Sequence, residues 1–252
     1  MRLVRRIEHQ GQFLFRWRSF LPLVLVPLAI IALSRGPLVD GTLSEYQKHI
    51  WLGFCMAVSF LGLGIRCITI GFTAAGTSGR NTRAQKATVL NTTGLYSLVR
   101  HPLYVGNFII VLGVAMSPME WWLVVIVCLT YWIYIERIGA AEEAYLAEKF
   151  GSAFTEWAAR TPAFLPRFDR WQSPELPFSL RKVMRREYHA FFLIVSAFFL
   201  VGLVSDFFQG EPIGQWPTDD GEWLLAFLVG AIVFVVLRAI KKRTTLLQVK
   251  RR

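Results

Sequence analysis

The sequence predicts an all-α integral membrane protein with about six transmembrane helices, two of which form a tight hairpin. Three observations predict this class. Hydrophobic residues fill 54% of the 252 positions and the mean hydropathy is +0.42, so the chain is more apolar than an ordinary soluble domain. Apolar runs of spanning or nearly spanning length recur along the chain. Basic residues gather in alternate connecting segments, as they do in membrane proteins of defined orientation.

The apolar runs supply the expected helices in order. They are Phe20–Ser34, Ile50–Phe72, Leu103–Ala115, Trp121–Ile135, His189–Phe207 and Trp223–Leu237. The third and fourth runs are short and only Met116–Glu120 separates them, so we expect a hairpin of tilted or partly sheltered helices. The second run carries small residues that allow another helix to approach closely. These are Gly53, Gly62, Gly64 and Gly71.

The net charge of +11 follows this topology. Of the 28 Lys and Arg residues, 25 lie in four segments, namely residues 1–18, 74–101, 137–188 and 238–252. The intervening loops are mainly acidic. This positive-inside pattern predicts that both termini are cytoplasmic, with a bacterial inner membrane as the expected location. Nucleic-acid binding would require basic residues gathered on one soluble face, and the sequence offers no such face.

Several polar residues near the runs have structural interpretations. Residues 1–18 are expected to be a plain basic flank, with an amphipathic interfacial helix as the alternative. Arg66, near the end of the second run, is expected to extend to the membrane surface, with a place in a functional site as the alternative. The cysteines lie inside apolar runs without CxxC spacing, which indicates buried structural thiols. They are Cys55, Cys67 and Cys128.

The largest basic segment, residues 137–188, is expected to continue the fourth helix as far as Gly151 and then become irregular. Four prolines interrupt its second half, at positions 162, 166, 174 and 177. An arginine-rich segment of this kind can cover the membrane face as a lid or bind anionic lipid.

The stretch LNTTGLYSLVRHPLYVG, which ends at Gly106, joins a basic loop to the third apolar run. Gly94 permits a tight turn, and Pro102 presets the first helical position. The residue before a proline is disfavoured in a helix, so His101 is expected at the junction itself. Three N–H groups should then be free donors at a positive helix end, suited to a carboxylate or phosphate. They belong to Leu103, Tyr104 and Val105.

Within that stretch, GLYSLVRHPLYVG resembles the GxYxxxRHPxYxG signature of the isoprenylcysteine carboxyl methyltransferase and phospholipid methyltransferase superfamily. Further along, EEAYLAEKFGSAFTEWAARTPAFLP is similar to the EExxL…FGxxYxxY…P run of the same superfamily. The matching positions are Glu142, Glu143, Leu146, Phe150 and Gly151. Phe154 and Trp157 replace the usual tyrosines, so aromatic bulk remains while two hydroxyls are lost. The resemblance covers about Gly94 to Pro166.

The resemblance implies a cytoplasmic pocket for S-adenosyl-L-methionine and methyl transfer to a lipid-borne acceptor. It implies catalytic roles for Arg100, His101, Tyr104 and Glu143. It also implies that the cofactor is bound by Gly94, Tyr96, Arg100, His101, Pro102, Leu103, Tyr104, Gly106, Glu142 and Glu143. We expect the chain to divide into an N-terminal part with the first two transmembrane helices (1–73), a catalytic core (74–170) and a basic linker with a C-terminal hairpin (171–252).

We expect the methionine carboxylate of the cofactor to meet Arg100 and the free N–H groups, while His101 and Tyr104 line the pocket. One glutamate of the pair 142–143 would hold an amino or ribose hydroxyl group. Adjacent helix positions point about 100° apart, so only one of the pair should face the site squarely. Glu136 shares the face of Glu143 and could be a second acid. His101 could instead act as a base, although an anionic acceptor needs none.

The acceptor is left open between a prenylcysteine carboxylate, a phosphatidylethanolamine amine and a lipid-linked phosphate. Basic side chains favour an anionic oxygen, and within the superfamily the lipid A phosphate methyltransferases are the leading comparison. The headgroup candidates are Arg80, Asn81, Arg83, Lys86, Arg160 and Arg167. Two alternatives remain, an NADPH-dependent enzyme of the sterol-reductase type and a non-catalytic membrane scaffold. No metal-site motif is present, so no metal is expected.

Overall fold

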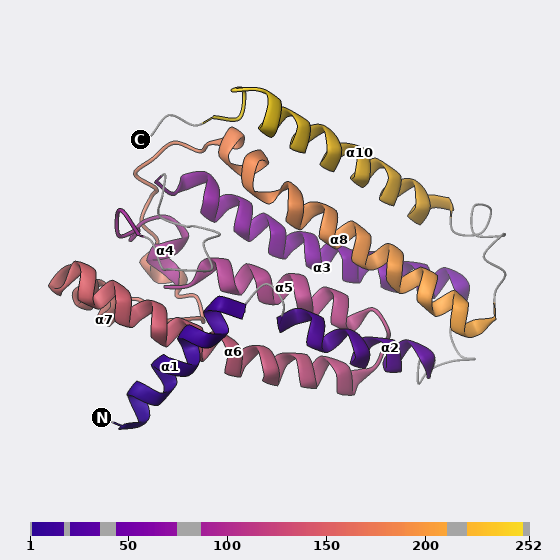
Figure 1. The fold of residues 1–252 in the computed structure, drawn as a ribbon, viewed down its shortest axis with the longest axis horizontal. Helices are drawn as coiled ribbons and strands as arrows, with labels where there is room; N and C mark the ends of the chain where they lie inside the picture. Colours follow the sequence, from indigo (N-terminus) through magenta and orange to yellow (C-terminus); the bar gives the residue numbers. More distant parts are fainter. Residues whose placement is uncertain (1, 18–20, 36–43, 75–86, 211–220, 249–252) are drawn as a thin grey trace.

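The computed structural model describes residues 2–17, 21–35, 44–74, 87–210 and 221–248, and these residues form helices and connecting segments without a strand. Most of the long helices lie side by side (Figure 1). Helix α3 ends and α5 begins at the same end of this bundle, which we call the motif end. The short helices α4 and α7 lie there as well. The all-α prediction is confirmed for the described residues.

The chain begins with α1 (Arg2–Trp17), a 3₁₀ turn (Leu21–Leu25) and α2 (Val26–Ser34). Helix α1 packs against α6, and a Cβ atom added at Gly11 would collide with the carbonyl oxygen of Arg137. The interpretation of this segment as a plain flank is therefore wrong, because it is a helix held against the bundle. Pro27 lies at the start of α2, which makes the first apolar run a short helix preceded by a turn.

Helices α3 (Glu45–Phe72) and α5 (Pro102–Met116) are packed very closely. A Cβ atom added at Gly62 would lie 2.5 Å from the carbonyl oxygen of Gly106, which is backbone-to-backbone contact. The expected small-residue contact is thus confirmed at Gly62. Gly53 and Gly64, by contrast, have nothing within 4 Å of an added Cβ atom.

Helix α6 (Trp121–Phe150) follows α5 after a short turn, which confirms the hairpin. It is one uninterrupted helix, so the expected continuation of the fourth run as far as Gly151 is also confirmed. Gly151 then takes a φ of +56°, a conformation that glycine adopts readily, and the chain turns into α7 (Ser152–Arg160). The hairpin therefore places the start of α5 and the end of α6 at the motif end.

The C-terminal hairpin consists of α8 (Leu180–Gln209) and α10 (Gly221–Arg243). Helix α8 begins earlier than the apolar run predicted, so the basic residues 181–186 are helical instead of irregular. It packs against α3, α5 and α2 as well as α10. Aromatic pairs line its contact with α10, for example Phe199 and Phe227 with ring centroids 4.4 Å apart.

Among the described residues, four helices are long and apolar enough to cross a membrane: α3, α6, α8 and α10. Helices α2 and α5, expected as the first and third spans, are shorter apolar helices. Length and composition therefore indicate an integral membrane protein. They make four of the expected spans candidates and leave the other two as predictions.

Candidate active site

The RHP motif lies between two short structures at the motif end. Gly94, with a φ of +62°, starts the single-turn helix α4 (Leu95–Leu98), and the chain then extends through Val99 to Arg100. His101 is the N-cap residue of α5 and Pro102 is its first residue, as the sequence predicted. Pro102 and His101 are both buried. The motif is therefore a fixed corner of the fold.

Residues 161–174, which we call the return segment, run along the motif and hold it in place. The Arg100 N–H donates to the carbonyl oxygen of Pro162 at 2.8 Å, and the His101 N–H donates to that of Ala163 at 3.2 Å. At the other end of the segment, the Gly94 N–H donates to the Gln172 carbonyl oxygen at 2.9 Å. The prolines that predicted an irregular segment thus leave its carbonyl groups available to the motif.

Arg100, His101 and Glu143 form one polar cluster, which we call the open cluster. The Arg100 Nη1 atom lies 2.6 Å from Glu143 Oε2, and His101 Nε2 lies 2.8 Å from Glu143 Oε1. Glu142 is more distant, with its Oε2 atom 3.8 Å from His101 Nδ1. Glu143 therefore makes the close contacts of the pair, as expected for adjacent helix positions.

The open cluster retains access to solvent and one unused donor. The side chain of Glu142 is 35% exposed and that of Glu143 is 24% exposed. The Nε atom of Arg100 is buried and has no hydrogen-bond partner among the described residues. A buried N–H without a partner is costly, so an anionic oxygen bound beside Arg100 would be stabilised there.

Aromatic rings enclose His101. The Phe164 ring, from the return segment, stacks on it with centroids 5.4 Å apart, and the Tyr104 ring lies 5.6 Å away. Gly139 of α6 makes this possible, since an added Cβ atom would lie 3.2 Å from Phe164 Cζ and 3.4 Å from His101 Nε2. Trp132 packs edge-on against Phe164. The imidazole is therefore fixed in orientation by packing as well as by Glu143.

Tyr96 lies behind the open cluster. Burial raises the pKa of its phenol well above the ordinary value, the Glu142 carboxylate adds to this rise, and Arg186 and Arg66 oppose it. Its carbonyl oxygen accepts a hydrogen bond of 3.2 Å from the indole Nε1 of Trp157. Trp157, which replaces a tyrosine of the signature, thus supplies a donor of its own.

Three expectations for the site need correction or fall outside the described residues. The N–H groups of Tyr104 and Val105 are not free, because both donate to the His101 carbonyl oxygen, at 3.1 and 3.2 Å. Glu136 does not join the cluster, since its exposed side chain faces Arg137. The headgroup candidates Arg80, Asn81, Arg83 and Lys86 lie outside the described residues.

The remaining predicted residues fall into two groups. Arg160 and Arg167 are exposed. The Arg160 side chain donates a hydrogen bond to the Glu156 carbonyl oxygen of its own helix, and Arg167 forms an ion pair with Asp169. Leu103 and Gly106 lie on α5, next to the cluster in sequence, and Gly106 faces α3. The structure therefore brings together the residues of the two signature halves, and leaves these arginines at the surface.

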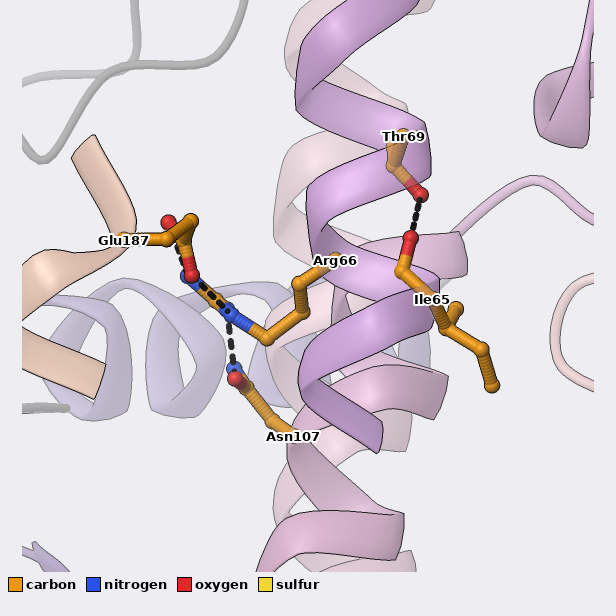
Figure 2. A network of polar contacts seen from close by, with 5 residues as sticks. All are labelled: Ile65, Arg66, Thr69, Asn107 and Glu187. Carbon is orange, nitrogen blue, oxygen red and sulfur yellow. Dashed lines mark hydrogen bonds and ion pairs between the residues drawn. The ribbon is translucent and has the colours of Figure 1, made fainter. Parts of the chain in front are cut away.

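Arg66 is the largest difference from expectation (Figure 2). It does not extend to the surface but points into the bundle, where its Nε and Nη2 atoms each lie 2.8 Å from an oxygen of Glu187 on α8. Its Nη1 atom donates to Asn107 Oδ1 on α5 at 2.5 Å. We call these three residues the sealed cluster, because the Glu187 side chain is only 4% exposed. A buried acid within reach explains why the guanidinium stays inside.

Sequence reasoning missed Glu187, Asn107, Phe164 and Gly139. Glu187 could have been suspected, since an acid at the start of an apolar run requires a counter-charge and Arg66 is another charge at similar depth. Phe164 has no such signal, because its place depends on how the return segment runs. Among the described residues, no group of three His, Cys, Asp or Glu side chains is placed to hold a metal ion.

Comparisons with known proteins show similarity over the central part of the chain. A family model described as phospholipid methyltransferase matches residues 52–153. The nickel-cobalt-cadmium resistance protein NccN of Alcaligenes xylosoxydans xylosoxydans is 32% identical over 163 residues, which are 64% of this chain and 70% of that protein. No solved structure matches the chain.

Two further relatives align over about half of their own length. The cobalt-zinc-cadmium resistance protein CzcN of Cupriavidus metallidurans is 35% identical over 44% of this chain and 49% of its own. The protein-S-isoprenylcysteine O-methyltransferase of Schizosaccharomyces pombe is 33% identical over 51% of this chain and 53% of its own.

Proposed function

Because the chain belongs to the isoprenylcysteine carboxyl methyltransferase and phospholipid methyltransferase superfamily, we propose that it transfers a methyl group from S-adenosyl-L-methionine to a lipid-borne acceptor. The observation that carries this proposal is the open cluster, in which Arg100, His101 and Glu143 converge at the motif end. The two halves of the signature, separate in sequence, meet there through the α5–α6 hairpin.

The residues present fit the cofactor. The unpartnered Nε donor of Arg100 suits the methionine carboxylate, which would form a charge-assisted hydrogen bond with it. The half-exposed carboxylate of Glu142 is an acceptor for an amino or ribose hydroxyl group. When bound, S-adenosyl-L-methionine supplies a methyl group on a cationic sulfur atom.

The chain's own part in the reaction is mainly positioning. Transfer of a methyl group needs nucleophile, methyl carbon and leaving sulfur in line, so fixed side chains matter more than proton transfer. His101 is held between Glu143 and the Phe164 ring and lines the site. An anionic acceptor needs no base, which leaves His101 a shaping role. Tyr104, beside the His101 ring, would line the same pocket.

For the acceptor we propose an anionic oxygen of a lipid, either a phosphate or a carboxylate. The relative from Schizosaccharomyces pombe is named for O-methylation of isoprenylcysteine, and the family model is named for phospholipids. Exposed arginines at the motif end, among them Arg160 and Arg167, would attract an anionic headgroup. By the positive-inside rule, the motif end and both termini lie in the cytoplasm.

Two relatives are named for resistance to nickel, cobalt, zinc or cadmium. Methylation offers a chemical route to such a role without metal binding by the protein itself. A methyl ester of a lipid phosphate or carboxylate carries one negative charge fewer, and it is a poorer ligand for divalent cations. A host lacking this chain should then tolerate less cadmium, and should recover with the wild-type gene but not with a Glu143→Gln variant.

The direct test is calorimetric titration of S-adenosylhomocysteine, the reaction product, into detergent-purified protein. We expect binding by the wild type and a loss of about tenfold or more with Glu143→Gln, because Arg100 and His101 lose the charged carboxylate that holds them in place. Glu136→Gln is the matched control, on the same helix but outside the cluster, and should bind like the wild type. Binding of NADPH in place of S-adenosylhomocysteine would assign the protein to a reductase, and binding of neither by folded protein would indicate a scaffold.

The acceptor is tested separately, by methylation of lipid extracts with radiolabelled cofactor. Label on an oxygen of a lipid that is anionic before methylation would support the ester product. Release of the label by mild base would then indicate a carboxyl methyl ester, and resistance to mild base would indicate a phosphate methyl ester. Label confined to amine headgroups would overturn the anionic acceptor while leaving methyl transfer intact.

A further inference from the structure

The sealed cluster joins helices from different parts of the chain. Arg66 and Asn107 lie within the region that the family model matches, whereas Glu187 on α8 lies beyond it. Both carboxylate oxygens of Glu187 accept from the Arg66 guanidinium, each at 2.8 Å. Two parallel hydrogen bonds fix the plane of the guanidinium as well as its position. Glu187 therefore decides where the Arg66 side chain points.

Arg66 in turn contacts α5 at two successive residues. Its Nη1 atom donates to Asn107 Oδ1 (Figure 2). Its aliphatic stem crosses Gly106, where an added Cβ atom would lie 2.7 Å from Arg66 Cγ. Gly106 is the last residue of the RHPLYVG motif. The position of this part of α5 along α3 is thus tied to the conformation of Arg66.

Helix α5 carries the candidate site on its first turn. His101 is its N-cap, and Tyr104 follows within that turn. The Tyr104 carbonyl oxygen accepts a hydrogen bond of 2.8 Å from the Tyr131 hydroxyl, which fixes the turn against α6. A shift of α5 on α3 would strain this contact and move His101 relative to Glu143 on α6.

A second contact ties α8 to α3 without reaching α5. The Nζ atom of Lys182 donates to the carbonyl oxygens of Thr73 and Ala74 and to the Thr73 hydroxyl, at the end of α3. The Ser179 N–H donates to the Gly71 carbonyl oxygen nearby, at 2.9 Å. This contact holds α8 in place and offers a control for the effect of Glu187.

We infer that Glu187 is a positioning residue for the candidate active site: by holding Arg66 against Gly106 and Asn107, it sets where α5 presents His101. Helix α8 is then part of the catalytic unit, and not only a membrane anchor. Burying an ion pair costs desolvation energy that offsets most of the attraction between its charges. The main effect of the Arg66–Glu187 pair is therefore to fix the geometry of the Arg66 side chain. The inference rests on the proposed function, since it concerns the same site.

The test uses full-length protein labelled with ¹⁵N-histidine, in detergent or nanodiscs. The chain has four histidines, and a His101→Asn variant assigns the His101 resonances. We expect Glu187→Gln to move the His101 ring resonances and to weaken S-adenosylhomocysteine binding by about tenfold. Lys182→Met should lower the melting temperature. It should leave the His101 ring resonances unchanged and the affinity for S-adenosylhomocysteine within about twofold of wild type.

Unchanged His101 resonances in Glu187→Gln, or equal changes in Lys182→Met, would overturn the inference and reduce α8 to structural support. Should Glu187→Gln fail to fold, the Arg66→Met/Glu187→Met double variant removes both charges together and takes its place. If the wild type binds no S-adenosylhomocysteine, the proposed cofactor is wrong, and the resonance comparison alone still decides the role of Glu187.

Discussion

Two clusters in this protein use the same chemistry in different surroundings. In the open cluster, Arg100 pairs with Glu143 and His101 shares the same carboxylate. In the sealed cluster, Arg66 pairs with Glu187 and Asn107 shares the same guanidinium. The carboxylate is 24% exposed in the first and 4% exposed in the second. The sealed guanidinium is bonded through Nε, Nη1 and Nη2, whereas the open one has a buried Nε atom without a partner.

The difference in surroundings separates two roles. A pair that retains access to solvent and an unused donor can exchange partners with a ligand at little cost. A pair enclosed by three helices cannot, because removing either partner strands a charge away from water. We therefore expect the ligand to contact the open cluster directly, and the sealed cluster to affect ligand affinity only through the position of α5. The free energy of unfolding should depend mainly on the sealed cluster.

The largest expected effect is that of Glu187→Ala. The variant leaves the Arg66 charge, on a side chain that is only 15% exposed, without its partner, which should lower the free energy of unfolding by about 3–5 kcal/mol. Glu143→Ala removes a similar pair at the open cluster and should cost about 0–1 kcal/mol, because solvent screens the remaining charge. Denaturation in mixed detergent micelles measures both. Equal losses would erase the distinction between the clusters.

Replacing both partners of the sealed pair sharpens the same comparison. The Arg66→Met/Glu187→Met variant leaves no uncompensated charge, so it should recover most of the stability lost in Glu187→Ala. A double variant as unstable as Glu187→Ala would mean that shape, and not charge, dominates this position.

The second effect concerns ligand affinity. Arg100→Lys keeps the positive charge but removes the unpartnered Nε donor and the planar fork. We expect S-adenosylhomocysteine to bind about tenfold to a hundredfold more weakly, which corresponds to the about 1.5–3 kcal/mol of a hydrogen bond to a charged group. The control is Arg167→Lys, an exposed arginine of the return segment. Unchanged affinity in Arg100→Lys would remove Arg100 from the proposed cofactor site.

The third effect tests the helix contact beneath the sealed cluster. A Cβ atom at Gly62 would lie 2.5 Å from the Gly106 carbonyl oxygen and 2.7 Å from the Ile110 nitrogen, so Gly62→Ala must push α3 and α5 apart. We expect a loss of about 1–3 kcal/mol in the free energy of unfolding. Gly64→Ala is the control, with nothing within 4 Å of the added atom. Similar losses at both positions would indicate a general helix effect.

Much of the open cluster could be predicted from the sequence, because its parts are local. His101 and Pro102 are neighbours, and the helix-breaking preference of the residue before proline places His101 at the corner. Glu143 was expected nearby because a short hairpin joins α5 to α6, which returns the end of one helix to the start of the other. The prediction of three free N–H groups at the start of α5 was wrong, since the His101 carbonyl oxygen accepts hydrogen bonds from two of them.

The sealed cluster could not be predicted, because its partners are distant in the chain. An arginine near the end of a membrane helix usually extends its side chain to the membrane surface when no acidic side chain is within reach, and the sequence suggested this for Arg66. Glu187 follows several basic residues, so its local sequence suggested a solvated segment. Helix α1 is similar: its basic residues predicted a flank, and only the close approach of Gly11 to α6 shows that it packs on the bundle.

The smallest expected effect lies behind the open cluster. Trp157→Phe removes the indole donor to the Tyr96 carbonyl oxygen but keeps an aromatic ring beside Phe154. We expect a loss of about 0.5–1.5 kcal/mol in the free energy of unfolding, the usual net value of one hydrogen bond. Trp171→Phe, at an exposed position of the return segment, should change it by less than about 0.5 kcal/mol. If Trp157→Phe were as destabilising as Glu187→Ala, the motif end would be as tightly fixed as the interior. Its residues would then lack the freedom to exchange partners that ligand binding at the open cluster requires.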